Sequence, residues 1–361
     1  MTGDRGTSIL TAGFVAATCA APALAQAKSE PNDPRFNEQW ALHNTGQFGF
    51  TADADIDALE AWTIRRSAPG VIVAVIDSGV DYLHPDLRDN IWTNPGEIPG
   101  NDIDDDKNGY VDDVHGWSFV EGAEGDPMDT DGHGTAVAGV IGASADNGIG
   151  IAGLCRDVRI MVVKVNERNR STTAAMAAGI RYAVDNGARV LNMSHTWVPD
   201  RAYRRALEHA DRAGVVMVTG AANDDRGGRD LDRDPVYPAG FELEHKVVAA
   251  GSGPGGGPAP SSNFGRRTVD LFAPAELITT TTIEPPGEYA AWSGNSLAAP
   301  FVSGTAALII AERPEWRAAE VIRAILESVD RAEAFGGLAR TGGHLNVHSA
   351  LRAARAEDHR E

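Results

Sequence analysis

The fold class is decided by the stretch VIVAVIDSG, which occupies residues 71–79. Its six leading apolar residues, Val71–Ile76, predict a strand that is buried on both faces, as strands of parallel sheets are. The strand runs directly into Asp77, and Ser-Gly follows as a turn signal. Functional groups of parallel α/β sheets gather at the carboxyl ends of strands, so Asp77 is a candidate site residue. Taken alone, it could equally be an aspartate that caps a turn.

Further apolar runs and helical patterns extend this interpretation over the chain. The additional strands are predicted at Val158–Val165, Val190–Met193, Val215–Thr219 and Val247–Ala250. The helices are predicted at Thr135–Ala143, Thr173–Asn186, Arg201–Ala213 and Leu297–Ala311. Strands and helices that alternate in this way predict an α/β fold, with a doubly wound, mainly parallel sheet and helices on both faces. No internal repeat is visible, and the segment Gly342–Ala354 is expected to be a short tail.

The composition excludes some classes of partner. The chain has 361 residues, of which 42% are hydrophobic, and this is enough for a sizeable core. Its formal net charge of −19 would repel the phosphates of nucleic acids and of anionic membranes. We therefore expect no nucleic acid partner.

The first 25 residues have the pattern of a signal peptide. Arg5 gives a weakly positive start, an apolar stretch runs over Ile9–Ala25, and residues 23–25 form a small-x-small cleavage site. The alternative is a short membrane anchor, for which the stretch is marginal. We expect a secreted or periplasmic protein with no stable membrane insertion after the signal is removed. Cys19 would leave with the signal, so Cys155 would be a lone thiol, and metal rather than a disulfide is expected to stabilise the mature chain.

Two further motifs carry chemistry. His133 lies in DGHGT (131–135), just before a predicted helix, where the flanking glycines permit close approach of the backbone. Ser296 lies in SGNSLAAP (293–300) and opens a second helix of small residues. As a nucleophile, Ser296 would gain from the helix dipole and free N–H groups, which favour negative charge on an attacked carbonyl. Each has a simpler interpretation, because Ser296 could be an N-cap and His133 an incidental residue of a capping loop.

Together, the order Asp, His, Ser resembles the subtilisin-like serine proteases, the subtilase family. The resemblance covers nearly all of the mature length and rests on VIDSG (75–79), DGHGT (131–135), LNMS (191–194) and SGNSLAAP (293–300). It implies that Ser296 attacks a peptide carbonyl, that His133 takes the proton and returns it, and that Asp77 holds the imidazole tautomer. The implied function is a secreted serine endopeptidase that acts on protein or peptide substrates through an acyl-enzyme. A catalytically impaired protein that binds peptides and an acyl hydrolase such as an esterase are the alternatives.

The resemblance also implies the groups around the triad. The family binds the oxyanion with an asparagine side chain, which Asn223 matches by position. The implied substrate-binding residues are Ser194, His195, Thr196 and Asn295. Three features depart from the family: Asn295 replaces the usual Thr, Ala222 replaces the usual Gly, and His195-Thr196-Trp197 replaces Leu-Gly-Gly. Trp197 is expected to narrow or reshape the substrate pocket, so we expect activity with altered specificity.

The expected organisation is a signal peptide over residues 1–25 and one peptidase domain over residues 26–361, with an acidic insertion around 88–120. Residues 31–40 already resemble the start of the catalytic domain, so no long pro-domain is expected between the signal peptide and the catalytic domain. Asp224 and Asp225 directly follow Asn223 and predict a preference for a basic residue before the scissile bond. The alternative is a solvated acidic turn.

The stretch DDDKNGYVDD (104–113) predicts a calcium loop. Oxygen ligands at alternate positions with a central glycine match the first part of an EF-hand-like loop, and oxygen donors without Cys or His favour calcium. The candidate ligands are Asp104, Asp106, Asn108, the carbonyl of Tyr110, Asp112 and Asp113. The final glutamate of an EF-hand is absent, with His115 in its place, and the alternative is a solvated acidic loop.

A second calcium site is implied by the resemblance alone. Asp86, Asn147 and the carbonyls of Ile149 and Ile151 match the family's strong calcium loop. The segment over residues 146–151 could equally be a turn that needs no ion.

Overall fold

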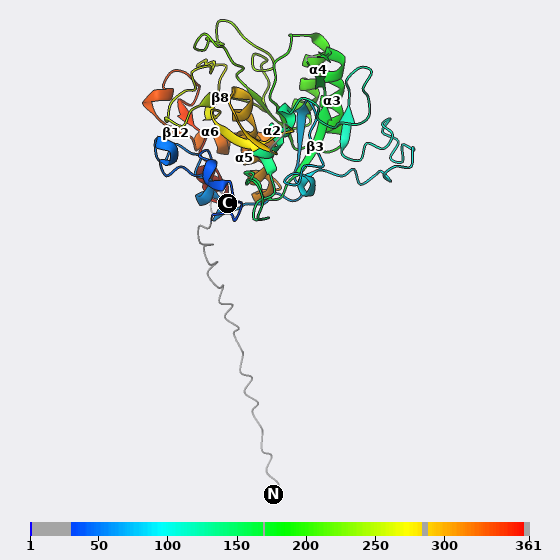
Figure 1. Ribbon diagram of the computed structural model, residues 1–361, viewed down its shortest axis with the longest axis horizontal. Coiled ribbons are helices and arrows are strands. Elements are labelled where there is room, and N and C mark those ends of the chain that lie inside the picture. Colours follow the sequence, from blue (N-terminus) through cyan, green and yellow to red (C-terminus); the bar gives the residue numbers. More distant parts are fainter. Residues whose placement is uncertain (2–29, 169, 284–287, 357–361) are drawn as a thin grey trace.

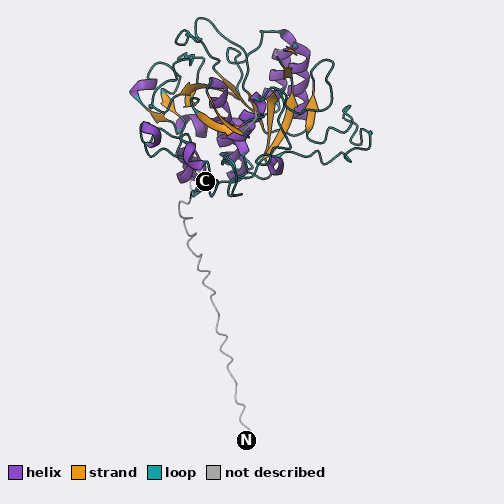
Figure 2. Cartoon of the chain, in the orientation of Figure 1, coloured by secondary structure: helices purple, strands orange, loops and turns teal. Residues whose placement is uncertain are grey.

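In the computed structural model, a large sheet runs through the middle of the molecule (Figure 2). The structure describes residue 1 and residues 30–168, 170–283 and 288–356, so the predicted signal peptide lies outside the described residues. The strands of the large sheet are β1 (Ile72–Asp77), β2 (Gly116–Ser118), β3 (Arg159–Lys164), β6 (Val190–Met193), β7 (Val216–Gly220), β8 (Lys246–Ser252), β9 (Leu271–Pro274), β12 (Asp330–Arg331) and β13 (Gly343–His344). Their spatial order is β12-β13-β9-β8-β7-β6-β1-β3-β2, and only β12 pairs antiparallel with its neighbour. The predicted parallel α/β fold is confirmed.

Two short hairpins and seven α-helices complete the described fold. The hairpins are β4 (Asn166–Glu167) with β5 (Arg170–Ser171), and β10 (Ile278–Thr281) with β11 (Tyr289–Trp292). The helices are α1 (Ala58–Trp62), α2 (His133–Gly142), α3 (Thr173–Asp185), α4 (Arg201–Arg212), α5 (Ala298–Glu312), α6 (Ala318–Glu327) and α7 (Val347–Ala356). All five predicted strands and all four predicted helices are present, with ends that differ by at most two residues from the expected ones.

Strand β1 lies between β3 and β6 and is packed from both sides. Val73 and Val75 face a core that contains α2, α5, α6 and α7, whereas Ala74 and Ile76 face a core that contains α3 and α4. Helix α2, which follows β2 and precedes β3, lies on one face of the sheet. Helices α3 and α4 follow β3 and β6 and lie on the other face, and Figure 1 shows them side by side. Connections that diverge in this way leave a crevice at the carboxyl end of β1, where Asp77 lies.

The helices begin and pack as their sequences dictate. Thr172 caps α3 by accepting the N–H of Ala175 at 3.1 Å, and Asp200 caps α4 by accepting the N–H of Ala202 at 2.6 Å. Helix α5 is buried continuously over residues 298–310, as expected for a helix that is apolar on all sides. It therefore forms the central helix of its core.

The first and last helices of the described chain pack against each other. The backbone N–H of Val347, at the start of α7, donates to the carbonyl of Ile56 at 3.0 Å, just before α1. Nδ2 of Asn346 donates to Asp57 at 2.7 Å, and Leu351 is fully buried. The segment expected to be a short tail thus supplies β13 and α7 to the main core.

Cys155 is buried without a disulfide partner in the described chain, and its Sγ donates to the carbonyl of Gly304 at 3.2 Å. Burial raises the pKa of this thiol, so it is inert rather than nucleophilic. Each helix within the described ranges is too short or too polar to cross a bilayer.

Candidate active site

Asp77 and His133 form the first pair of the site. Asp77 ends β1 with its side chain 3% exposed, and His133 opens α2. Nδ1 of His133 lies 2.7 Å from Oδ1 of Asp77, and the same oxygen accepts the N–H of Ser78 at 2.8 Å. A Cβ on Gly134 would lie 2.0 Å from the carbonyl oxygen of Gly79, so glycine is required for α2 to start this close to β1. The contact engages Nδ1 and leaves Nε2 to serve a reacting group.

The electrostatics of this pair follow from burial and charge. Burial of the His133 ring disfavours its charged form, but the negative charge and hydrogen bond of Asp77 outweigh burial and raise the pKa of His133. The same pairing outweighs the burial of Asp77 and lowers the pKa of its carboxyl group. Asp77 therefore stays ionised in neutral solution and stabilises a proton on His133.

Ser296 lies in the short turn Asn295–Leu297 that leads into α5. Its carbonyl accepts the hydroxyl of Ser194 at 2.7 Å, which fixes the turn against the end of β6. Its own hydroxyl forms no hydrogen bond with any residue in the described part of the chain. Contacts of a nucleophile with its base often tighten only when substrate binds, so this geometry is compatible with a role in catalysis.

Asn223 lies three residues after the end of β7 and is exposed. Its Oδ1 accepts the backbone N–H of Asn295 at 2.8 Å. Because that N–H can only donate, the contact identifies the oxygen end of the amide and leaves the Asn223 NH2 group as a donor. A Cβ on Gly294 would lie 3.3 Å from Nδ2 of Asn223 and 3.5 Å from Oγ of Ser296, so the predicted donor and the predicted nucleophile flank the same point.

A cavity of about 510 Å³ includes both Ser296 and Asn223 in its lining. The other lining residues are Asn166, Ser171, Ser194, His195, Thr196, Trp197, Gly220, Ala222 and Arg229. Three of the predicted substrate-binding residues, those of the segment 194–196, thus lie together in the same cavity lining as Ser296. Sequence reasoning missed the β4–β5 hairpin and Arg229; the hairpin's signal was a polar segment directly after a predicted strand.

His195 and Trp197 belong to the segment 195–197, whose sequence differs from the usual family sequence, and they have different environments. Both ring nitrogens of His195 are buried without a hydrogen-bond partner among the described residues, and burial lowers the pKa of the ring. Trp197 donates its backbone N–H to Tyr237 at 2.8 Å and its indole Nε1 to Thr173 at 3.1 Å. The indole is therefore anchored at the start of α3 while Trp197 still lines the cavity.

Asn295, which was predicted to bind substrate, lies outside the cavity lining. Its residue exposure is 1%, and its side chain points into the protein, where Oδ1 accepts the hydroxyl of Ser262 at 3.0 Å and Nδ2 donates to the carbonyl of Ala222. It does not line the cavity, because these internal contacts hold its side chain away from the cavity.

Comparison with protein families matches residues 68–344 to the subtilase family. This chain belongs to the subtilase family. Family membership and the relatives below assign it to the serine endopeptidases. It is 31% identical to thermitase of Thermoactinomyces vulgaris over 323 residues, which cover 89% of this chain and 99% of thermitase.

Other relatives extend the comparison. The thermophilic serine proteinase of Bacillus sp. strain AK1 is 31% identical over 332 residues, 90% of this chain and 72% of the relative. Subtilisin-like protease 1 of Plasmodium berghei is 27% identical over 344 residues, and this chain spans only 55% of its length. Among solved structures, proteases from Pseudoalteromonas arctica PAMC 21717 superpose with a TM-score of 0.70 at 25% identity, over 90% of this chain and 100% of that one.

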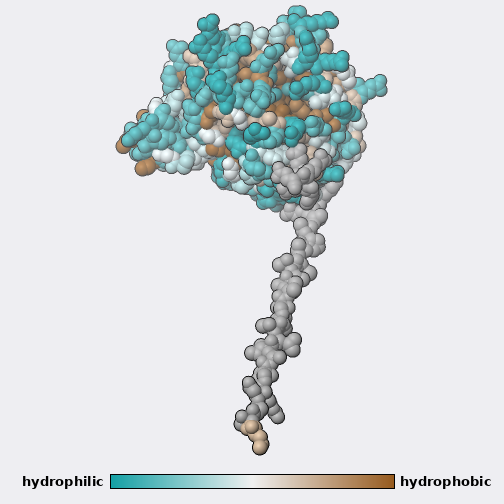
Figure 3. Space-filling model, turned by 180° about the vertical axis from the view of Figure 1, so that it is seen from behind, coloured by the Kyte–Doolittle hydropathy of each residue, from teal (hydrophilic) through white to brown (hydrophobic). Residues whose placement is uncertain are grey.

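The acidic insertion of this subtilase projects from one side of the molecule, where apolar side chains stand among polar ones (Figure 3). The exposed apolar residues of the segment are Ile98, Ile103 and Val111. In the same segment, carboxylate oxygens of Glu97, Asp106 and Asp113 lie within 4.8 Å of one another. Burial raises the pKa of Asp113, and repulsion from Asp106 adds to the shift. Three converging carboxylates, two of them buried, fit a hard divalent cation.

Two of the predicted loop ligands, Asp104 and Asp112, lie outside the group of three converging carboxylates and accept backbone N–H groups. Asp104 accepts the backbone N–H groups of Asn108 and Gly109, at 3.1 and 2.9 Å, and so serves the turn itself. Asp112 accepts the N–H groups of residues 100 and 102, at 2.8 and 2.9 Å. Local backbone donors therefore satisfy both carboxylates.

The remaining predicted ligands stay near the cluster. Nδ2 of Asn108 donates to Asp106 and Asp113, at 3.1 and 3.0 Å. Tyr110 follows in the loop, with its ring packed edge-on against Tyr182. Glu97 was not predicted as a ligand. It could supply the carboxylate of the final EF-hand glutamate, which the loop lacks, although it precedes the loop in the turn-rich stretch NPGEIPG (94–100).

Three of the residues implied for a second calcium site lie together. Asp86 is fully buried, and its oxygens accept Nδ2 of Asn147 at 2.6 Å and the N–H of Ile151 at 3.0 Å. Burial raises the pKa of Asp86. Ile149 lies at the exposed tip of the same loop. Asp33, missed from sequence, also holds the loop by accepting the N–H of residue 147 at 3.2 Å.

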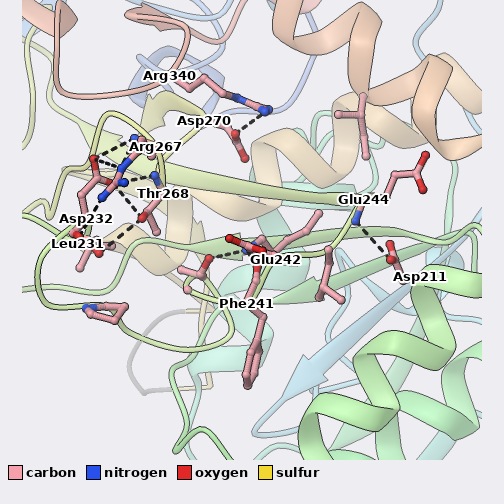
Figure 4. A pocket seen from close by; sticks show the side chains of 16 residues that line it. Asp211, Leu231, Asp232, Phe241, Glu242, Glu244, Arg267, Thr268, Asp270 and Arg340 are labelled. Carbon is pink, nitrogen blue, oxygen red and sulfur yellow. Dashed lines mark hydrogen bonds and ion pairs between the residues drawn. The ribbon is translucent and has the colours of Figure 1, made fainter.

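A second large cavity, of about 660 Å³, lies at the amino ends of β8 and β9, the opposite edge of the sheet from Asp77 (Figure 4). Arg340 pairs with the buried Asp270 at 2.7 Å, and Nζ of Lys246 donates to the carbonyls of Ala239 and Phe241. The buried charges here already have partners.

Proposed function

We propose that this subtilase is a secreted endopeptidase that cleaves protein or peptide substrates through an acyl-enzyme on Ser296. The observation that supports this most directly is the 2.7 Å contact between His133 and the buried Asp77, together with the unengaged hydroxyl of Ser296, which lines the cavity. Secretion is supported by the signal-like pattern over residues 1–25.

In the proposed reaction, a peptide carbonyl binds in the cavity next to Ser296. Nε2 of His133 takes the hydroxyl proton as Oγ forms a bond to the carbonyl carbon, and Asp77 stabilises the imidazolium that results. The carbonyl oxygen becomes negative and accepts a hydrogen bond from Nδ2 of Asn223. Collapse of this intermediate breaks the C–N bond, and His133 returns the proton to the leaving amine.

Deacylation repeats the sequence with water. His133 removes a proton from the water that attacks the acyl carbon, and Asn223 again stabilises the oxyanion. Release of the new carboxylate restores the Ser296 hydroxyl. The segment 194–196 and the β4–β5 hairpin supply the walls along which the substrate chain would lie.

We also propose calcium as a structural cofactor. Glu97, Asp106 and Asp113 would hold it, and the carbonyl of Tyr110 and the side chain of Asn108 are further proposed ligands. A cation would neutralise crowded carboxylates and so hold the projecting insertion closed. A second ion at Asp86 and Asn147 is proposed from the resemblance.

A fluorophosphonate probe tests the function, because it labels only a serine that a base has activated. We expect labelling of the wild type, none of Ser296→Ala, and casein digestion by the wild type alone. Casein left intact by a labelled protein that cleaves short esters would indicate an esterase. A folded wild type that is not labelled would be a peptide-binding protein without catalytic activity.

A further inference from the structure

Ala222, directly before the oxyanion donor Asn223, has a left-handed backbone with φ of 59°. Residues with a Cβ pay a steric cost in this region, so the turn needs outside support. The turn directs the Ala222 carbonyl toward the interior, where Nδ2 of Asn295 donates to it. The neighbouring carbonyl of Ala221 is held in the same manner by Nδ2 of Asn263 at 2.8 Å.

The Asn295 side chain is itself fixed at both ends. Its Oδ1 accepts the hydroxyl of Ser262 at 3.0 Å, and that hydroxyl oxygen accepts the N–H of Gly251 in β8 at 2.9 Å. A Cβ on Gly251 would lie 2.3 Å from Oδ1 of Asn295, so the glycine makes room for this amide. The buried amide thus links a rigid strand to the turn that carries Asn223.

The backbone of Asn295 completes the link. Its N–H donates to Oδ1 of Asn223 at 2.8 Å, and the next residue is Ser296. One residue therefore orients the amide of the donor, supports the turn behind it and precedes the nucleophile.

We propose that the side chain of Asn295 is a positioning residue for the oxyanion donor, and that Asn295 and Ala222 form a matched pair. The proposal rests on the proposed function. The hydrogen bond from Asn295 offsets the strain at Ala222 and holds Nδ2 of Asn223 on the side of Gly294 where Oγ of Ser296 also lies. Loss of this support displaces the donor from the developing oxyanion while the substrate groove stays intact, so turnover falls and substrate binding does not.

The test compares four proteins: Asn295→Thr, Ala222→Gly, the double variant and wild type. Asn295→Thr is expected to lower kcat about 10- to 100-fold with KM within about twofold, because small displacements of catalytic groups cost this much. Ala222→Gly alone should lower kcat much less than Asn295→Thr does, and its own kcat is the reference for the double variant. The double variant should recover most of the lost kcat, because glycine adopts the left-handed turn without support.

Two controls separate positioning from general stability. Asn90→Thr removes another buried amide, which bonds the carbonyls of Gly142 and Arg156 away from the triad, and should lower the melting temperature without changing kcat. A peptide aldehyde, which forms an oxyanion on Ser296, should bind Asn295→Thr more weakly in proportion to kcat. Fluorophosphonate titration counts active sites in each sample.

The outcomes are distinct. Equal kcat in wild type and Asn295→Thr, or additive effects of the two substitutions, would overturn the pairing. If Asn295→Thr does not fold, the conservative Asn295→Ser is measured in its place with the same expected pattern. An unlabelled wild type would instead contradict the proposed function.

Discussion

Nδ1 of His133 lies 2.7 Å from the buried carboxylate of Asp77, and this contact joins the start of α2 to the end of β1. It raises the pKa of the imidazole, so kcat/KM should rise with pH as His133 loses its proton, with a midpoint above the ordinary 6.5. Asp77→Asn should move the midpoint down and lower kcat by about 10⁴-fold, the size found when a triad aspartate loses its charge. NMR titration of the imidazole in Ser296→Ala provides the direct measurement. A midpoint that is the same with Asp77 and Asn at this position would contradict the assignment.

The same pair predicts how stability depends on pH. A histidine whose folded pKa exceeds its unfolded value stabilises the fold fully below the unfolded pKa, and this contribution disappears as pH rises through the folded pKa. The difference in melting temperature between Ser296→Ala and Ser296→Ala/Asp77→Asn should therefore shrink as pH rises above 6.5. At low pH the lowered pKa of Asp77 matters instead. The stability that ionised Asp77 contributes to the folded state is lost as pH falls below 3.8 and through the folded pKa. A constant difference between pH 6 and pH 10 would count against the pairing.

Asn223→Ala should lower kcat with little change in KM, because an oxyanion donor acts in the transition state. The expected loss is about 10²–10³-fold, a magnitude measured for the corresponding donor of subtilisin itself. Asn166→Ala is the matched control, since Asn166 also presents an amide to the cavity but lies on the β4–β5 hairpin. That variant should change KM more than kcat. The reverse pattern would make Asn223 a substrate contact.

Arg229 lines the substrate cavity, with its guanidinium 2.8 Å from Asp234 and its Nε 3.9 Å from Asp224. The positive charge of Arg229 offsets that of Asp224, the acidic residue predicted to favour a basic substrate side chain. Arg229→Gln should raise the ratio of kcat/KM for lysine over glutamate peptides about fivefold, the effect of ~1 kcal/mol for a partly exposed charge. Arg226→Gln, in the exposed part of the same loop, is the control and should leave the ratio unchanged. An unchanged ratio in Arg229→Gln would remove Arg229 from the specificity pocket.

Calcium should raise the melting temperature of Ser296→Ala, which cannot digest itself, and chelator should lower it. Binding to the folded state alone stabilises by about 2.7 kcal/mol when free calcium is a hundredfold above its dissociation constant. Glu97→Gln should blunt the response, whereas Glu121→Gln removes an exposed acid elsewhere and should not. Identical melting curves in calcium and chelator, with no calcium by elemental analysis, would show that the acidic insertion needs no ion.

The elements with strong local patterns could be predicted from sequence. Strand β1 is buried on both faces and therefore has a continuous apolar run, whereas α4 is buried on one face and has apolar residues at the helical period. Both patterns predict the ends of their elements to within one residue. Strands β12 and β13 are two residues long, and their pairing depends on chain segments far away. Too few residues carry a period there for any local pattern to show.

The site divides in the same way. Asp77, His133 and Ser296 stood out because their motifs are local, whereas Glu97 joins Asp106 only through the folding of the insertion. The direction of Asn295 was also hidden, because a hydrophilic residue beside a nucleophile gives no local sign that it faces inward.

The contact between α1 and α7 has a consequence for how the chain matures. In a polypeptide that is exported or synthesised from its amino end, α1 emerges long before α7, which begins at Val347 and packs against it. Until then the part of α1 that α7 covers stays exposed, although Trp62 already has partners in Phe36 and Leu154. The contact between α1 and α7 therefore forms late, and the protease becomes fully stable only after α7 has been synthesised. Such a delay would limit premature digestion of neighbouring proteins.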